Sequence, residues 1–364
     1  MRVRDFANLV EALAPLDLAE SWDNSGLQVG DPEARVKRVA LALDASLDTI
    51  QKAINEKAQL LITHHPLIFK PVKRLLSSDP LTKPAFLALA NNLAILSAHT
   101  NWDMVDVAKR LAEVMELRDV RPLTMGERSF LKLVAFVPKG FEDKIRDAAA
   151  RAGAGTIGKY EGCFFKAPGQ GGFKVPLDAK PFMGTPGQDE TAEEFRLEMI
   201  LPAHLRDQIA QAVKAAHPYE EPAFEFYGLS VPADGFGAIG HWDRERGGEE
   251  LHGFLSDKIK TPGLWAGKPG PERVKIVATL PGSGGDFIQV AKKAGADLFV
   301  TGEINHHHSL LAQDLGLPVF LAGHFESEYP SFLRLANLIK EATLPCGEVG
   351  FVVLDELPSI RHKP

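Results

Sequence analysis

The sequence has little cysteine, no long apolar run and no excess of basic residues, and each absence excludes a class of protein. Two cysteines in 364 residues, Cys163 and Cys346, do not make a disulfide framework, so we expect free thiols in a reducing compartment. The longest stretch without charge, residues 84–102, is interrupted by Asn, His and Pro and does not predict a membrane span. The first residues also lack the apolar core of a signal peptide, and we expect a cytoplasmic protein without a membrane partner.

The charge and the apolar content are those of a globular protein. The chain has 41 Lys and Arg against 48 Asp and Glu, a net charge of −7, which argues against binding nucleic acid through a broad basic surface. Hydrophobic residues make up 45% of the chain and charged residues 24%. These proportions and the length suit a folded chain of about two or three domains.

An internal repeat is the most informative feature. Residues 39–63 align with residues 277–301 without a gap, at a constant offset of 238, and Val, Ala, Asp, Ile, Gln, Leu and Thr coincide. Each copy has the pattern of an apolar strand, a polar turn, an amphipathic helix and a second apolar strand, which is typical of a βαβ unit with parallel strands. A further helix and strand follow each copy, the strands at residues 93–97 and 319–322. The repeat predicts an α/β fold whose core has two similar halves and a sheet containing parallel strands.

The segment between the copies has a different pattern. It predicts strands at residues 130–137, 196–201 and 223–229 and helices at residues 140–152 and 205–216, while the Gly- and Pro-rich residues 169–190 are expected to be irregular. A β-α-β-β-α-β order of this kind predicts an inserted α+β domain of ferredoxin-like type. We therefore expect residues 1–128 to form the first half of the core, 129–231 the insert and 232–364 the second half.

Two adjacent histidines, His64 and His65, end the apolar strand LLIT of the first copy. Ligands of parallel sheets bind at the carboxyl ends of the strands, so these side chains are candidate metal ligands. Adjacent residues of an extended chain point to opposite sides, so the pair could serve two neighbouring ions, or one ion if the chain bends at Pro66. The alternative is a pair of surface histidines at a turn.

A histidine also precedes a carboxylate by four residues after each copy, as His99 and Asp103 and again as His324 and Glu328. Imidazole and carboxylate together suit Zn, Fe, Mn, Co or Ni, and a carboxylate that bridges two ions suits a hydrolytic site. Glu328 alone could be a solvated acid, but the repeated spacing favours a metal ligand.

Several further residues are candidates for roles beside the ions. His99 matches His324 in the repeat and could transfer a proton or contact the substrate. Glu303 aligns with His65 and could hold a ligand histidine or a water molecule. We expect the run His306–His308 to lie outside the direct ligands, and residues 22–26 either form a turn or line the pocket.

The segments SWDNSGLQVG, LLITHHPLIF, SAHTNWD, TGEINHH and LAGHFESE resemble those of the Nif-three-like family, also called GTP cyclohydrolase 1 type 2 homologues. The resemblance covers nearly the whole chain, and HPYEEPAFEFY resembles part of the extra domain of the longer members. It implies two divalent transition-metal ions per chain and self-association into a ring-shaped homo-oligomer, commonly a hexamer. The metal ligands that it implies are His64, His65, Asp103, His324 and Glu328.

We expect metal-dependent hydrolysis of a small, nucleotide-like substrate, and the resemblance implies GTP. The ions would polarise the substrate or activate water, and His99 or Glu303 would relay a proton. Two other functions stay open. One is a metallo-phosphoesterase that acts on another substrate, and the other is a non-enzymatic protein that handles metal or regulates a partner.

Overall fold

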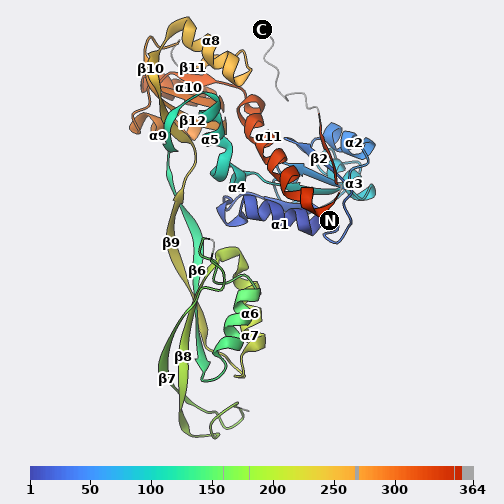
Figure 1. The fold of residues 1–364 in the computed structure, drawn as a ribbon, viewed down its shortest axis with the longest axis vertical. Helices are drawn as coiled ribbons and strands as arrows, with labels where there is room; N and C mark the ends of the chain where they lie inside the picture. The colour runs from blue at the N-terminus through green and yellow to red at the C-terminus, as the bar shows by residue number, and fades with distance from the viewer. Residues whose placement is uncertain (159, 180, 267–269, 348, 355–364) are drawn as a thin grey trace. The chain divides into compact units, whose positions relative to one another are not determined.

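The structure is a computed structural model that describes residues 1–158, 160–179, 181–266, 270–347 and 349–354 (Figure 1). The chain divides into two compact units, residues 1–126 with 233–364, and residues 127–232. We call the first the core unit and the second the insert unit, and each is described by itself. The core unit contains both copies of the repeat.

The first half of the core unit is a sheet with helices on both faces. Its sheet has the order β1-β4-β3-β2-β15, in which β1 is antiparallel to β4 and the other neighbours are parallel. Alternate residues of the strands face opposite sides: Leu41 and Ile62 pack with α1, whereas Ala40 and Leu61 pack with α2 and α3. The elements are α1 (Val3–Leu13), β1 (Gly26–Val29), β2 (Arg38–Ala42), α2 (Leu47–Asn55), β3 (Leu60–Thr63), α3 (Lys83–Ala90), β4 (Ala94–Ser97) and β15 (Gly350–Val353).

The second half has the same succession of helices and strands. Its sheet has the order β11-β14-β13-β12-β10-β5, with β12, β13 and β14 parallel and β11 antiparallel to β14. β10 and β5 extend the sheet as antiparallel strands. The elements are α8 (Gly248–Ile259), β11 (Leu264–Ala266), β12 (Val274–Ser283), α9 (Ile288–Lys293), β13 (Leu298–Glu303), α10 (His306–Asp314) and β14 (Val319–Leu321), with β10 (Ala238–Arg246) beside β12 and β5 (Arg118–Pro122) at the edge.

The pairing registers of the two halves confirm the repeat. Val39 pairs with Leu60 between β2 and β3, and the residues 238 positions later, Val277 and Leu298, pair between β12 and β13. The expected α/β fold with parallel strands is therefore confirmed, and each half has its own sheet.

The repeat changes its offset at the third parallel strand. Ser97 stands opposite Thr63 on β4, and Leu321 stands opposite Thr301 on β14, so the offset there is 224 because the β3–β4 connection is 14 residues longer. By this register the counterpart of His99 is a glycine, Gly323. The expected equivalence of His99 with His324 is wrong by one residue, since the difference in loop length is invisible in the ungapped alignment.

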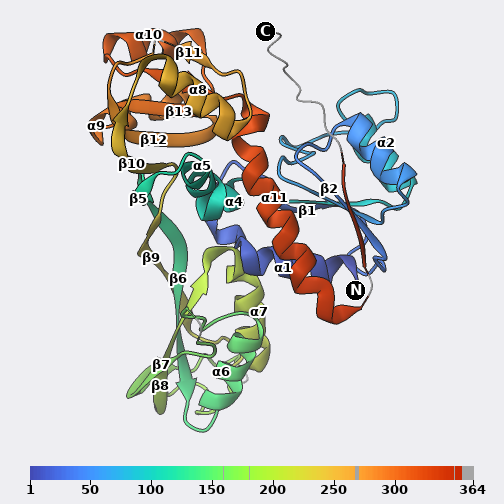
Figure 2. The same ribbon diagram turned by 45° about the horizontal axis from the view of Figure 1, so that its top comes forward.

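Each half contributes its last helical segment to the core of the other half. The chain continues from β4 through α4 (Thr100–Trp102), the π-helical turn η2 (Asp103–Val107) and α5 (Ala108–Val114), and α5 packs against α8 and β12 of the second half. In return α11 (His324–Thr343) leaves β14 and places Phe332, Leu335 and Ile339 in the core of the first half. Figure 2 shows α11 between the two sheets.

A buried polar contact joins these exchanged segments. The indole Nε1 of Trp102 donates to Ser331 Oγ over 2.9 Å, and the Ser331 hydroxyl donates to Asp106 Oδ2 over 2.6 Å. All three residues are buried. Because buried polar groups are costly without partners, this chain of hydrogen bonds fixes how α11 crosses η2.

The insert unit has one sheet of order β7-β8-β6-β9, with β8 antiparallel to both β6 and β7. Its helices bury Ile145, Ala149, Ile209 and Val213 against the sheet. The elements are β6 (Met125–Pro138), α6 (Glu142–Arg151), β7 (Phe165–Lys174), β8 (Asp189–Pro202), α7 (Arg206–Ala216) and β9 (Phe224–Asp234). The β-α-β-β-α-β order is observed, and the ferredoxin-like assignment stays a prediction.

The expectation of an irregular segment at residues 169–190 is wrong at both ends. Residues 169–174 belong to β7 and pair with β8 as far as Lys174 opposite Asp189. Glycine and proline are tolerated here because β7 is an edge strand, where a missing side chain or N–H costs little.

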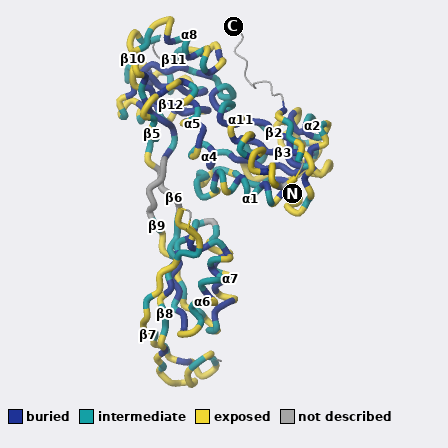
Figure 3. The backbone as a smooth tube through the Cα atoms, viewed as in Figure 1, coloured by how far each residue is buried: buried dark blue, intermediate teal, exposed yellow. Residues whose placement is uncertain are grey.

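Figure 3 shows that buried residues follow the strands and the inward faces of the helices. None of the described helices combines the length and the apolar character that a membrane span requires.

The insert unit leaves and rejoins the core unit at adjacent strands. Leu123 and Thr124 donate backbone hydrogen bonds to Gly237 and Phe236, and Gly235 donates to the Thr124 carbonyl over 3.0 Å. A short linker can therefore join residues 126 and 233, on either side of the insert unit, without moving β5 or β10.

We predict that a variant with residues 127–232 replaced by a short Gly/Ser linker folds and binds as much metal as the full chain. Elemental analysis measures the metal, and the solution mass of the same sample tests the expected ring-shaped oligomer and the effect of the insert on it. A folded deletion variant that takes up no metal would contradict the prediction.

Candidate metal centre

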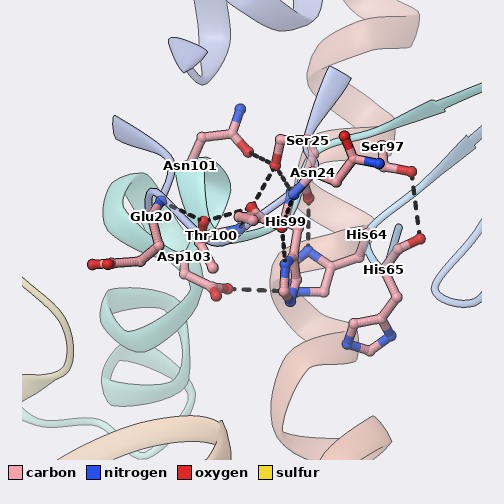
Figure 4. Close-up of polar contacts among 12 residues, drawn as sticks. Glu20, Asn24, Ser25, His64, His65, Ser97, His99, Thr100, Asn101 and Asp103 are labelled. Carbon is pink, nitrogen blue, oxygen red and sulfur yellow. Dashed lines mark hydrogen bonds and ion pairs between the residues drawn. The ribbon is translucent and has the colours of Figure 1, made fainter. Parts of the chain in front are cut away.

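His64 and His65 lie directly after β3, where the chain bends. Both backbone N–H groups donate to the Leu43 carbonyl, over 3.2 and 2.9 Å, and this shared acceptor turns the two residues out of the extended course of β3. As a result their ring centroids are only 4.9 Å apart (Figure 4). The chain bends at the histidines themselves, one step before the expected bend at Pro66, and both rings reach the same site.

Glu328 of α11 is the buried carboxylate that the histidines surround. Its side chain is 6% exposed. Its Oε2 lies 3.3 Å from His65 Nε2 and 3.9 Å from His64 Nε2, and its Oε1 lies 3.2 Å from His324 Nε2. Burial alone would raise the pKa of Glu328, but the hydrogen bonds from His324 and His65 outweigh it and hold that pKa well below its usual value. The carboxylate is therefore ionised.

Asp103 approaches the same ring nitrogen of His64. Its Oδ1 is 3.4 Å from His64 Nε2, the contact drawn in Figure 4. Asp103 is the first residue of the π-helical turn η2, a local widening of the helix that is frequent at functional sites. The structure thus brings the five expected ligands to one place, from both halves of the core unit.

The ring nitrogens that face away from the site are anchored. Nδ1–H of His64 donates to the Ala98 carbonyl and that of His65 to Asp44, each over 2.8 Å. His324 Nδ1 lies 3.3 Å from Glu303 Oε1, so Glu303 holds a histidine as the repeat suggested. Such outer partners fix the ring orientation and leave Nε2 for a metal ion.

Asp44 is a site residue that sequence reasoning missed. It follows β2, the strand that neighbours β3, so an acid at the end of the adjacent parallel strand was the available signal.

His99 forms a separate pair with Asp23. Its Nδ1–H donates to Asp23 Oδ1 over 2.8 Å, while the hydroxyls of Ser25 and Thr100 donate to Asp23 Oδ2. Burial alone would raise the pKa of Asp23, but the hydrogen bonds from His99, Thr100 and Ser25 hold it well below its usual value. Residues 22–26 are thus more than a turn, because Asp23 orients a histidine beside the site.

The site has the features of a metal centre. Ligand atoms of His64, His65 and His99 lie within 4.8 Å of one another, as do those of His65, His324 and Glu328. His64 Nε2 is buried without a hydrogen-bond partner. Buried polar atoms are nearly always satisfied, and imidazole nitrogen and carboxylate oxygen are donors that divalent transition metals bind. This group of residues could therefore hold a metal ion.

Gly282, the last buried residue of β12, makes room for Glu328. Its φ is +68°, and a Cβ there would stand 2.4 Å from Glu328 Oε1 and 3.4 Å from His324 Nε2. Its N–H donates to Ser327 Oγ over 3.0 Å, one residue before Glu328. Only glycine leaves the carboxylate in place.

The histidine run His306–His308 begins α10 outside these ligand groups. His308 Nε2 lies 3.3 Å from Asp286 Oδ1, and His306 and His307 are exposed. None of the three belongs to a candidate metal group among the described residues.

Comparisons with known proteins agree with this fold. The chain matches Duf34/NIF3 (NGG1p interacting factor 3) over residues 1–358. It is 37% identical over 351 residues, 95% of this chain and 93% of the relative, to a Bacillus subtilis protein named GTP cyclohydrolase 1 type 2 homolog. A Staphylococcus aureus protein of the same name is 31% identical over 332 residues, 90% of each chain. The crystal structure of a Bacillus cereus protein related to NIF3 aligns with a TM-score of 0.70 and 31% identity, over 100% of this chain and 98% of that one.

We predict that Gly282→Ala weakens metal binding at least tenfold, because its Cβ displaces the Glu328 carboxylate. The matched control is Gly295→Ala, which has the same kind of strain (φ +85°) but no atom within 4 Å of the new Cβ. Titration of both metal-free variants with Zn²⁺ or Mn²⁺ measures the effect. Equal affinities in the two variants would contradict the role of Gly282.

We also predict that metal binding at pH 7.5 releases protons from His65 and His324. Burial lowers the pKa of both, but Asp44 and Glu328 raise that of His65 to about 10, and Glu328 with Glu303 raises that of His324 to about 9. Both rings are therefore protonated in the metal-free protein, whereas a metal ligand must be neutral. Calorimetric titration in buffers of different ionisation enthalpy measures the release.

The sign of the pH dependence follows from the same shifts. Metal affinity falls as the pH drops below about 9, because protons compete for the two rings. The stability that these raised pKa values give the metal-free fold is complete below the ordinary value of 6.5 and is lost as the pH rises through 9 to 10. His306→Gln, at an exposed histidine, should leave the proton release unchanged, and an unchanged release in His65→Gln would contradict the assignment.

Proposed function

Because the chain belongs to the Duf34/NIF3 family and carries a buried group of histidines and carboxylates, we propose that it is a metal-dependent hydrolase with two divalent transition-metal ions and a nucleotide-like substrate. The observation that carries the proposal is the position of Glu328. One of its oxygens faces His64 and His65 and the other faces His324. A carboxylate placed in this way suits the bridge between two ions.

The remaining donors divide between two neighbouring positions. Asp103 and His64 belong to the first, and His324 belongs to the second. His65 lies between them, since its Nε2 is 3.3 Å from both Glu328 Oε2 and His324 Nε2. This division supports a dinuclear site made from the five ligands that the family resemblance implies.

When bound, such ions act as Lewis acids and lower the pKa of water toward neutrality. The protein's own contribution to proton transfer is His99. Because its Nδ1–H is held by the ionised Asp23, its Nε2 is left to accept a proton from the attacking water and to return it to the leaving group. Glu303, which is half-exposed beside His324, is a second group that can pass protons to solvent.

GTP is the substrate that we propose to test first, because the relatives are named GTP cyclohydrolase 1 type 2 homolog. Hydrolysis at the imidazole carbon of guanine would add one water and open that ring to a formamide, and a second water would release the carbon as formate. A phosphoesterase using the same ions would release phosphate instead. The ring-shaped homo-oligomer, hexameric in the family resemblance, remains part of the proposal, as does a cytoplasmic location.

We predict that the reconstituted chain holds about two ions and opens the guanine ring of GTP. Asp103→Asn should hold about one ion fewer and lose turnover, because among the described residues the Asp103 carboxylate contacts His64 Nε2 and neither His65 nor His324. Elemental analysis counts the ions, and ultraviolet absorbance with formate and phosphate assays follows the reaction. The control is Asp286→Asn, at an exposed acid on α9's N-terminal side, which should change neither.

Each other outcome rejects a stated part of the proposal. One ion in the unaltered chain rejects the dinuclear site. Phosphate release without ring opening shows a phosphoesterase. A fully loaded protein that turns over neither GTP nor phosphoesters shows a metal-handling or regulatory protein.

A further inference from the structure

The connection between β3 and β4 is the main difference between the two halves. It is 14 residues longer than the connection between β13 and β14, and residues 66–82 within it form neither helix nor strand. This segment starts directly after His65, at the metal centre.

The beginning of this segment is held in place by amide side chains. Gln28 Oε1 accepts from the backbone N–H groups of Leu67 and Ile68 over 2.7 and 3.1 Å. Asn24 Nδ2 donates to the Ile68 carbonyl over 2.5 Å, and Gln28 Nε2 donates to the Asn24 carbonyl over 2.6 Å. These bonds tie residues 67–68 to residues 24–28, next to Asp23, so the following residue, Phe69, is held at a defined place.

The bonds bring two exposed aromatic rings together beside His99. The ring centroids of Trp22 and Phe69 are 5.6 Å apart, and each lies 6.1 Å from the His99 ring in an edge-on arrangement. Trp22 is 56% exposed and Phe69 is 46% exposed. A single exposed aromatic residue needs no explanation. Two such rings, on segments that hydrogen bonds join beside a histidine of the site, form a surface prepared for a partner.

We propose that Trp22 and Phe69 form an aromatic platform that binds the planar heteroaromatic ring of the substrate by stacking. The inference rests on the proposed function and adds the residues that recognise the ring. A ring sandwiched between the two would need about 7 Å, twice the optimal contact distance of 3.5 Å. The substrate ring therefore lies on the exposed side of the pair.

The position of the platform suits a reaction at the ring better than a reaction at a phosphate. Hydrolysis of the ring requires that the ring, and not the triphosphate, lies beside the histidines. The His99 ring is 5.2 Å from the His64 ring and 5.5 Å from the His65 ring. A base on Trp22 and Phe69 is thus separated from the proposed metal ligands by the one histidine to which we assign proton transfer.

Trp22 also supplies a direct measurement. The chain has four tryptophans, of which Trp102 and Trp242 are buried and Trp265 packs on Phe320 at 5.2 Å. A nucleotide that stacks on Trp22 should therefore quench the fluorescence of the exposed tryptophan. The experiment uses the full chain loaded with metal, titrated with GTP, ATP, CTP and UTP and, as a probe without a base, with tripolyphosphate.

We expect GTP to quench the fluorescence and tripolyphosphate not to. Trp22→Leu and Phe69→Leu should each weaken GTP binding about tenfold by calorimetry, since stacking of a base on an aromatic ring contributes substantially to binding. Both should leave the metal content and the affinity for tripolyphosphate unchanged and raise KM more than they lower kcat. Trp22→Phe keeps a ring and should restore most of the binding. The matched control, Phe86→Leu, alters an exposed phenylalanine of α3 and should bind GTP normally.

Other results overturn the platform. One is that none of the four nucleotides quenches the fluorescence. Others are that the leucine variants lose GTP and tripolyphosphate affinity equally, or that both bind GTP as the unaltered chain does. A fluorescence that changes with protein concentration would show that a second copy covers the rings. The outcome for the proposed function is separate. Stacking without turnover rejects the hydrolase and keeps the platform, whereas turnover with an unchanged KM in both leucine variants rejects the platform and keeps the hydrolase.

Discussion

The ionised carboxylate of Glu328, buried between the two halves of the core unit, is the constraint on which the site depends. Removing such a charge from water costs on the order of several kcal/mol unless other charges and hydrogen bonds compensate. Here the compensation comes from His65 and His64 of the first half and from His324 of its own helix. The metal-free protein satisfies the carboxylate with protons on two of these rings, and bound metal would satisfy it without them. The carboxylate thus links the closure of the fold to the chemistry of the site.

The exchange of helices explains how α11 can place that carboxylate. α11 belongs to the second half by sequence and to the core of the first half by packing, so its start must pass close to the ends of β12 and β13. Two glycines allow the close approach: a Cβ on Gly302 would meet the Gly282 carbonyl at 2.5 Å and His324 Cα at 2.9 Å. About one turn after Glu328 on α11, Ser331 accepts a hydrogen bond from the indole Nε1 of Trp102. Apolar packing alone would allow α11 to slide along its axis, whereas these contacts fix its position.

Much of this arrangement could be predicted from the sequence, and the reason is the regularity of βαβ units. Parallel strands put His64 and His65 at one edge of the sheet, and the repeat drew attention to Glu328. The sequence does not show which half a helix packs on, because an amphipathic pattern marks an apolar face and not its partner. That Asp44 anchors His65 depends on which strands are neighbours, and the only sign of it in the sequence is an acid just after β2. The offset of one residue between His99 and His324 arose from a connection whose length differs between the halves.

The duplicated scaffold works because the two copies use equivalent positions for opposite purposes. Asp44 and His65 of the first copy correspond to Gly282 and Glu303 of the second. In the first copy the acid follows β2 and anchors a histidine that follows β3. In the second copy a glycine at the first position makes room for Glu328, and an acid at the second position anchors the histidine of α11. If both copies carried the acid, a side chain would occupy the space of the Glu328 carboxylate; if both carried the glycine, His65 would lose its anchor. An asymmetric site therefore requires that the two copies diverge at these positions while the strands between them keep one register.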